Sequence, residues 1–108
     1  MGTWQGGVIR IIARRTLITF AARHPTSRSA LMRWAAAIES GAWSSMADVA
    51  GAFSGAKVLN GERARFEVAG GAFRLVVAFD LRRQIAFVKF VGSHAEYDRV
   101  DALTVSQF

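Results

Sequence analysis

The chain has 108 residues, a length that suits one domain with one hydrophobic core. Hydrophobic residues make up 52% of it, which excludes a disordered chain, and the lack of cysteine excludes a disulfide scaffold and a cysteine-based zinc site. The net charge is +6, and twelve of the fourteen basic residues are arginines, whose planar guanidinium suits the binding of phosphate. This excess of positive charge indicates either a solvated basic surface or a polyanionic partner, RNA or an acidic protein.

The sequence carries no signal for a membrane. Its apolar runs are much shorter than the roughly twenty residues of a membrane-spanning helix, and the N-terminus has no continuous apolar block followed by a cleavage site. We therefore expect a cytoplasmic protein that does not contact a membrane. His24 and His94 lie far apart and form no metal-ligand pattern, so we expect neither a metal nor another cofactor.

The N-terminal part is predicted to contain one strand followed by two helices, all within a single domain. Residues 1–9 are interpreted as a loose extension, and the β-branched residues of Val8–Ala13 indicate a strand. Thr16–Arg23 has apolar residues at helical spacing and ends before the only proline of the chain. A second helix begins near Ser27, a residue type that favours the N-cap, and Gly41 ends it.

The second half is predicted to be a sheet, because its apolar residues alternate with a period of two from Ala56 onward. Asn60-Gly61 is expected to form a hairpin turn, since both residues tolerate positive φ, and Gly70-Gly71 is expected to form a second turn.

Two longer strands follow these turns. Phe73–Asp80 alternates between an apolar face and a face that contains Arg74, and Ile85–Val91 is apolar on both faces, as a central strand is. The sequence therefore predicts an α+β fold in which N-terminal helices pack on an antiparallel β-sheet meander.

Arg74 is the strongest candidate for a catalytic cation. It lies inside a predicted strand, out of phase with the core, and a rigid strand holds a cation in the preorganised position that stabilises a charged transition state. The alternative is an ordinary surface arginine. Lys89 interrupts an otherwise apolar strand, so it either contacts phosphate or extends to solvent at an edge.

A second group of candidates follows the last predicted strand. His94 is the natural proton-transfer group near neutral pH, although a lone histidine is more often structural. Glu96 is either a general base or the acidic start of a short helix. Tyr97 either stacks on an RNA base or anchors the core.

Four further arginines are candidates for contacts with an RNA backbone. Arg63 and Arg65 share one face of a predicted strand, and Arg14 and Arg15 begin the first predicted helix. Such residues position a nucleic acid or solvate the surface, and they do not react.

The order and spacing of these residues resemble the HigB-type toxins of bacterial type II toxin–antitoxin systems, within the RelE/ParE superfamily. The resemblance extends from about Ile11 to Val105. Its landmarks are Ile12–Leu17, His24-Pro25, Ala42-Trp43, Ala47–Val49, Phe73–Val77 and Phe90–Asp98, of which the last is the most specific.

This resemblance implies a small ribonuclease that cuts mRNA in translating ribosomes without a metal. It also implies neutralisation by a helix-turn-helix antitoxin of the HigA type. Arg74 matches the strand arginine that contacts the scissile phosphate in RelE-like enzymes. His94 falls in the segment that supplies catalytic groups, and Lys89 matches a position that is often basic.

The chain departs from the family pattern close to these residues. Ala72 and Phe73 stand where the family often has asparagine and tyrosine, so two polar groups are missing. Glu67 stands where RelE itself has a lysine, and a carboxylate at that place repels phosphate.

From these observations we expect a ribosome-associated mRNA endonuclease. Arg74 and Lys89 would stabilise the charge on the phosphorus centre, His94 or Glu96 would transfer protons, and Tyr97 would orient a base. Two alternatives share the fold: a toxin that binds a protein target such as gyrase and has no ribonuclease activity, and a degenerate protein that only binds its antitoxin.

Overall fold

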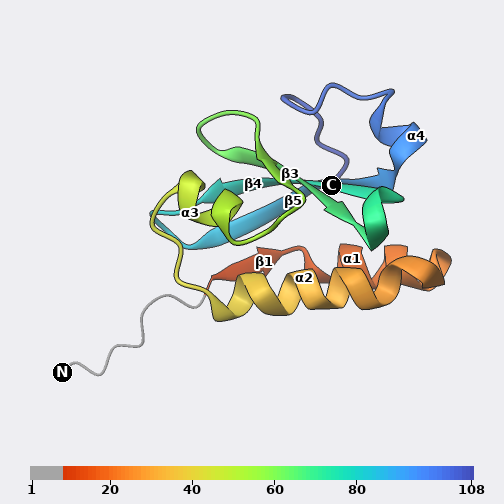
Figure 1. Cartoon of the computed structure of the whole chain (residues 1–108), viewed down its shortest axis with the longest axis horizontal. Helices are drawn as coiled ribbons and strands as arrows, with labels where there is room; N and C mark the ends of the chain where they lie inside the picture. The colour runs from red at the N-terminus through yellow and green to blue at the C-terminus, as the bar shows by residue number, and fades with distance from the viewer. Residues whose placement is uncertain (1–8) are drawn as a thin grey trace.

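Two long helices pack against one face of a five-stranded sheet in the structure, a computed structural model that describes residues 9–108 (Figure 1). In chain order the elements are β1 (Arg10–Ile12), α1 (Arg14–Arg23), a 3-10 turn (Pro25–Ser27), α2 (Arg28–Ser40), α3 (Met46–Gly51), β2 (Ala56–Val58), β3 (Arg63–Val68), a second 3-10 turn (Ala69–Gly71), β4 (Phe73–Asp80), β5 (Ile85–Ser93) and α4 (His94–Tyr97). The predicted α+β architecture, with helices before the sheet, is confirmed.

The sheet has the strand order β1-β5-β4-β3-β2 and is mixed. Strands β2 to β5 form the predicted antiparallel meander. The expectation of a wholly antiparallel sheet is wrong at one edge, because β1 pairs in parallel with β5 and places Arg10 opposite Ile85. The meander leaves the backbone groups of β5 open on that side, and β1 supplies partners for them. Strand periodicity alone carries no information about this direction.

The hydrophobic core lies between the sheet and α1 and α2. Leu31, Trp34, Ala35 and Ile38 form the buried stripe of α2, as their helical spacing predicts. Phe66 of β3 is 1% exposed and lies at the centre of an aromatic group. Its ring centroid is 5.2 Å from those of Trp34 and Phe53 and 6.1 Å from that of Phe79, in edge-to-face geometry. Within residues 9–108 no helix has the length and apolar character needed to cross a bilayer.

The end of the predicted extension belongs to the core. Ile9, which the sequence places in the loose extension, is 0% exposed and packs in the hydrophobic cluster. Residues 1–8, which include the first residue of the predicted strand, lie outside the described part of the chain. The folded domain therefore begins no later than Ile9.

The turn at Asn60-Gly61 and the start of α2 at Ser27 are found where the sequence predicts them, but their hydrogen bonds differ from the predicted ones. The turn at Asn60-Gly61 exists, yet neither residue has positive φ; instead the Asn60 side chain accepts hydrogen bonds from the amides of Glu62 and Arg63. Ser27 precedes α2, but its hydroxyl donates to the carbonyl of His24 and caps no amide. In both cases the residue type correctly indicates the end or start of an element. The hydrogen bonds that its side chain makes there depend on the neighbouring backbone.

We expect Phe66→Ala to lower the free energy of unfolding by about 3–5 kcal/mol, because it empties a fully buried site among three aromatic rings. Ile18→Ala is the matched control, since Ile18 is 52% exposed and its loss should change stability by less than about 0.5 kcal/mol. Urea unfolding followed by circular dichroism measures both. Equal stability of the two variants would contradict this assignment of the core.

Candidate functional site

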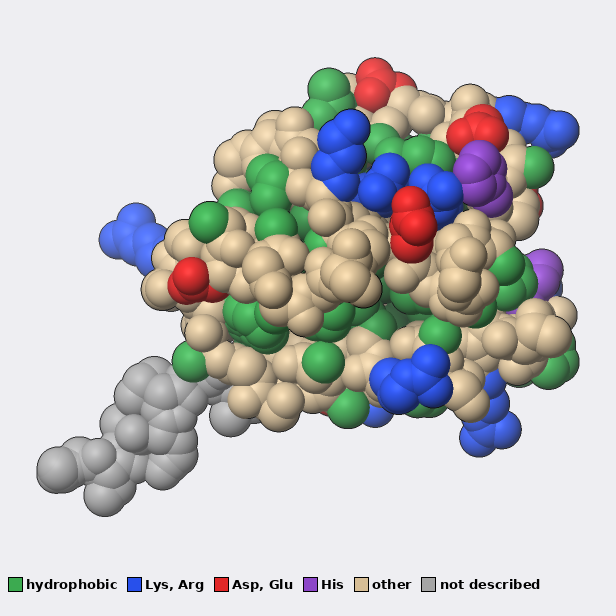
Figure 2. All heavy atoms as spheres, in the orientation of Figure 1, with side chains coloured by type: hydrophobic (Ala, Val, Ile, Leu, Met, Phe, Trp, Pro, Cys, Tyr) green, Lys and Arg blue, Asp and Glu red, His purple; other side chains and the backbone are tan. Residues whose placement is uncertain are grey.

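The face of the sheet turned away from the helices carries a group of charged side chains. Because successive residues of a strand point to opposite faces, Arg65 and Glu67 of β3 lie opposite the core residue Phe66. On β4, Arg74 alternates with the core residues Phe73 and Leu75 in the same way, and the strand register places it directly opposite Glu67. Figure 2 shows basic side chains gathered around an acidic one in the region where β3 and β4 lie in Figure 1.

Glu67 lies between the two guanidinium groups. Its Oε2 atom is 3.4 Å from Nη2 of Arg65 and 3.6 Å from Nη2 of Arg74. The arginine side chains are largely buried, at 19% and 11% exposed, and the Nε atoms of both have no hydrogen-bond partner within residues 9–108. Buried donors without partners are rare in folded proteins. The two arginines are therefore positioned by the sheet but not saturated with hydrogen bonds.

Helix α4 closes one end of this charged face. Ser93 and Glu96 form a capping box, in which the Ser93 hydroxyl accepts from the Glu96 amide and the Glu96 carboxylate accepts from the Ser93 amide. One position later, the Tyr97 ring lies under the guanidinium of Arg74, at 5.5 Å from Cζ to the ring centroid. Tyr97 also packs near Phe90. The cap thus fixes the ring on which the strand arginine rests.

His94 begins α4 and has an ionisable partner. Its Nδ1 atom is 3.1 Å from Oδ2 of Asp98, and its side chain is 52% exposed. Its backbone amide donates to the carbonyl of Ala72, which precedes β4. His94 and Tyr97 are three residues apart on a helix and therefore lie on neighbouring positions of its surface. The structure thus brings His94 to the same end of the sheet as Tyr97 and Arg74.

Glu96 and Lys89 are the two remaining catalytic candidates, and both have contacts within the fold. The Glu96 carboxylate is occupied by the Ser93 amide, which matches the structural alternative for this residue. The Nζ atom of Lys89 lies 5.5 Å from the ring centroid of Phe87, which pairs with Ala78 on β4. Lys89 itself lies on β5 at the irregularity between the Val76 and Val77 pairings, and its ammonium group is turned toward Phe87, away from the end of β5 that pairs with Arg74.

Arg63 has a structural position. It is 8% exposed, and its Nη1 atom donates to the carbonyl oxygens of Ala102 and Val105, at 3.0 and 2.8 Å. The segment after α4 therefore runs back over the sheet on the side opposite the long helices (Figure 1). A guanidinium committed in this way is not free to contact RNA.

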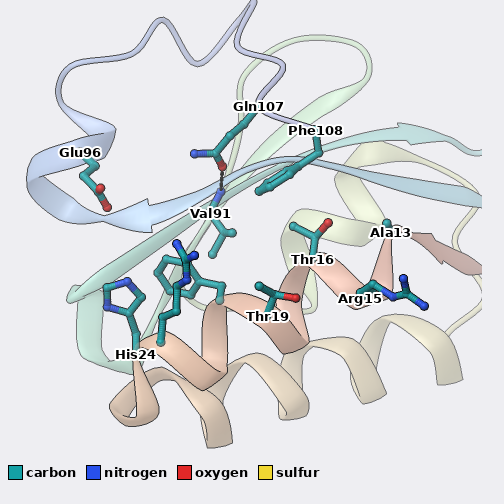
Figure 3. Close-up of a pocket in the computed structure, with 11 residues that line it drawn as sticks. Ala13, Arg15, Thr16, Thr19, His24, Val91, Glu96, Gln107 and Phe108 are labelled. Atoms are coloured by element: carbon teal, nitrogen blue, oxygen red, sulfur yellow. Dashed lines mark hydrogen bonds between the residues drawn. The ribbon is translucent and has the colours of Figure 1, made fainter.

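The two arginines at the start of α1 also differ from each other. Arg14 forms an ion pair with Glu39 of α2. Arg15 lines a groove of about 420 Å³ between α1 and the end of β5 (Figure 3). Among the other lining residues are Thr16, Thr19 and Arg23, which the sequence analysis did not single out. Their spacing predicts that they share one side of a helix, but it does not show which other segment lies opposite them.

No group of three or more histidine, cysteine, aspartate or glutamate side chains within residues 9–108 has the geometry to hold a metal ion.

The chain matches the model of a known protein family. The model of a family described as HigB_toxin, the RelE-like toxic component of a toxin–antitoxin system, matches residues 27–100. No curated protein matches the chain. The matched span covers α2 to α4 and includes the charged face, whereas α1 and the first landmarks of the resemblance lie before it.

We expect Arg63→Met to lower the free energy of unfolding by roughly 1.5–3 kcal/mol, the usual value of a hydrogen bond to a charged group. Amide hydrogen exchange should rise across residues 99–108, because the variant removes both bonds that hold this segment to β3. Arg65→Met is the matched control on the same strand and should leave that exchange unchanged. Unaltered exchange in Arg63→Met would show that the segment is held by other contacts.

Proposed function

This chain belongs to the HigB family of RelE-like toxins, and we propose that it is a metal-independent endoribonuclease that cleaves mRNA on the ribosome and so inhibits translation. The toxic component of such a system has an antitoxin as its partner. For that antitoxin we propose a helix-turn-helix protein of the HigA type. A substrate on the ribosome places the activity in the cytoplasm.

The observation that carries the proposal is the pair of incompletely bonded arginines on the open face of the sheet. Arg65 and Arg74 are held by β3 and β4, the Nε donor of each is buried with no partner among residues 9–108, and Arg74 rests on the ring of Tyr97. Preorganised donors of this kind stabilise negative charge that develops in a transition state, because they need no reorganisation when it forms.

The chemistry that suits these groups is attack of a ribose 2′-hydroxyl on the adjacent phosphate. A base takes the proton of the 2′-hydroxyl, the new P–O bond forms a 2′,3′-cyclic phosphate, and the 5′-oxygen leaves after it accepts a proton. Arg74 and Arg65 would contact the phosphoryl oxygens, whose charge increases at the pentavalent stage. Tyr97 would support Arg74 and help to orient a base.

His94 is the residue that we propose for proton transfer. Asp98 holds its Nδ1 atom and so orients the imidazole, which leaves Nε2 to face a substrate. Glu96 is a weaker candidate, because its carboxylate caps the helix. The ammonium group of Lys89 is turned toward Phe87 and away from the end of β5 that pairs with Arg74, so we place it outside the reaction centre.

Glu67 favours a second candidate function. It places a carboxylate between the two cations that would bind phosphate, which weakens attraction for RNA. A charged face of mixed sign also suits a protein surface. The competing proposal is therefore a toxin that binds a protein target such as gyrase and cleaves no RNA.

We expect Arg74→Ala to slow mRNA cleavage by about 10²–10³-fold, because it removes one preorganised cation from a charged transition state. The variant should remain folded and still bind the antitoxin, since Arg74 points away from the core. Arg82→Ala is the matched control, because Arg82 is an exposed arginine in the turn after β4. Primer extension on a reporter mRNA with ribosomes measures cleavage, and thermal unfolding of the same preparations measures folding.

A folded Arg74→Ala protein that cleaves at the parental rate would remove this residue from the mechanism. If the wild-type protein cleaves no mRNA with or without ribosomes but blocks gyrase in a supercoiling assay, the competing function is correct. If it does neither and still binds the antitoxin, the chain is a degenerate toxin.

We expect Glu67→Gln to increase the affinity for RNA by about fivefold, the equivalent of roughly 1 kcal/mol for removal of one repelling charge at close range. The side chain keeps its shape, so the two arginines keep their positions on the sheet. Fluorescence anisotropy with a labelled single-stranded RNA measures the affinity at several salt concentrations, because an electrostatic effect declines as salt rises. Weaker binding by this variant would mean that Glu67 serves to orient Arg74 and not to repel the substrate.

A further inference from the structure

The groove beside α1 lies where the sheet edge changes its partner. In the described part of the chain, strand β1 pairs with Ile85–Phe87 of β5. Beyond that point Gln107 takes over, since its backbone amide donates to the Lys89 carbonyl at 2.8 Å and its side-chain oxygen accepts from the Val91 amide at 3.1 Å. Figure 3 shows Gln107 and Phe108 on one side of the opening and Thr16 and Thr19 of α1 on the other. The groove is thus walled by two segments distant in sequence.

The charged side chains of the groove are mainly basic. Arg15 and Arg23 are exposed and form no ion pair with any described residue. They are eight residues apart on α1, which separates them by about 12 Å along the helix axis. The hydroxyl groups of Thr16 and Thr19 lie between them in sequence. Glu96 is the one acidic residue that lines the groove, and its carboxylate accepts from the Ser93 amide.

Aromatic rings complete the lining. Phe20 and His24 are stacked with their centroids 4.2 Å apart, and both lie edge-on to Phe73, at 5.6 and 5.7 Å. Phe108 contributes a half-exposed ring from the opposite side. Proteins bind single-stranded nucleic acid without strict sequence preference through this combination, a basic groove that follows the backbone and aromatic rings on which bases stack.

The groove and the charged face meet at the end of the sheet. Phe73 packs against the rings of the groove, while the next residue, Arg74, points to the opposite face. Glu96 lines the groove, while the next residue, Tyr97, lies under Arg74. A strand that leaves the Arg74 side can therefore continue past α4 into the groove.

We propose that this groove binds the single-stranded RNA that flanks the cleavage site, with Arg15 and Arg23 on backbone phosphates and the Phe20–His24 stack and Phe108 against a base. The proposal deepens the function given above and rests on it for the identity of the ligand. The residues that would contact RNA there, Arg15, Phe20, Arg23, His24 and Phe108, lie outside the residues 27–100 that the family model matches.

The test measures binding of a labelled, single-stranded 2′-O-methyl RNA, which cannot undergo 2′-hydroxyl attack, by fluorescence anisotropy over a series of salt concentrations. We expect Arg15→Ser/Arg23→Ser to reduce the slope of log affinity against log salt by about 1.4, since each phosphate contact on a single strand contributes roughly 0.7. Arg28→Ser/Arg82→Ser is the control with the same loss of charge, because both residues are exposed and lie outside the groove. It should leave the slope nearly unchanged.

An unchanged slope in the folded groove variant overturns the proposal, and so does an equal reduction in the control, or a wild-type protein that does not bind this RNA at low salt. A groove variant that binds RNA normally but loses the antitoxin also overturns it, because the groove would then be a protein-docking surface. The proposed function is judged separately: if the wild type binds RNA through Arg15 and Arg23 but cleaves no mRNA on ribosomes, the groove stands and the ribonuclease proposal fails.

Discussion

The antiparallel pairing of β3 with β4 is the constraint on which the rest of the molecule depends. It places Phe66 opposite Leu75 on the core side and Glu67 opposite Arg74 on the other side. Since side chains alternate between faces, a shift of one residue in this register would bring Arg74 into the core and expose Leu75. The burial of the aromatic group around Phe66 makes such a shift costly. The hydrophobic core therefore also determines where the candidate catalytic cation stands.

The ion pairs on the charged face are weak enough to be exchanged for a ligand. Glu67 lies 3.4 and 3.6 Å from its two arginines, distances that exceed those of good charge-assisted hydrogen bonds. Glu67 is itself 37% exposed, so solvent screens both pairs and they contribute little to stability. An RNA phosphate presents several acceptor oxygens and can compete with Glu67 for the terminal Nη2 groups of the two arginines. In the free protein Glu67 thus holds the two side chains near each other, and in a complex it opposes the substrate charge.

The segment after α4 gives two other residues their roles. Arg63 holds its backbone on one face of the sheet, and Gln107 closes the edge of β5 that β1 leaves open. The groove beside α1 exists because this segment supplies its second wall. Arg63 is therefore a structural anchor, although it shares a strand face with Arg65. The RNA-contacting role that we propose falls partly to Arg15 and Arg23.

The sequence by itself determined the fold class, the face on which Arg74 lies and the group around His94 and Tyr97, because helix and strand periods and local turns are encoded in neighbouring residues. Tertiary structure alone decided the parallel pairing of β1, the burial of Arg63, the contact of Lys89 with Phe87 and the groove beside α1. Each of these depends on segments that are far apart in the chain and meet only when the core forms, and local periodicity contains no information about which segments meet.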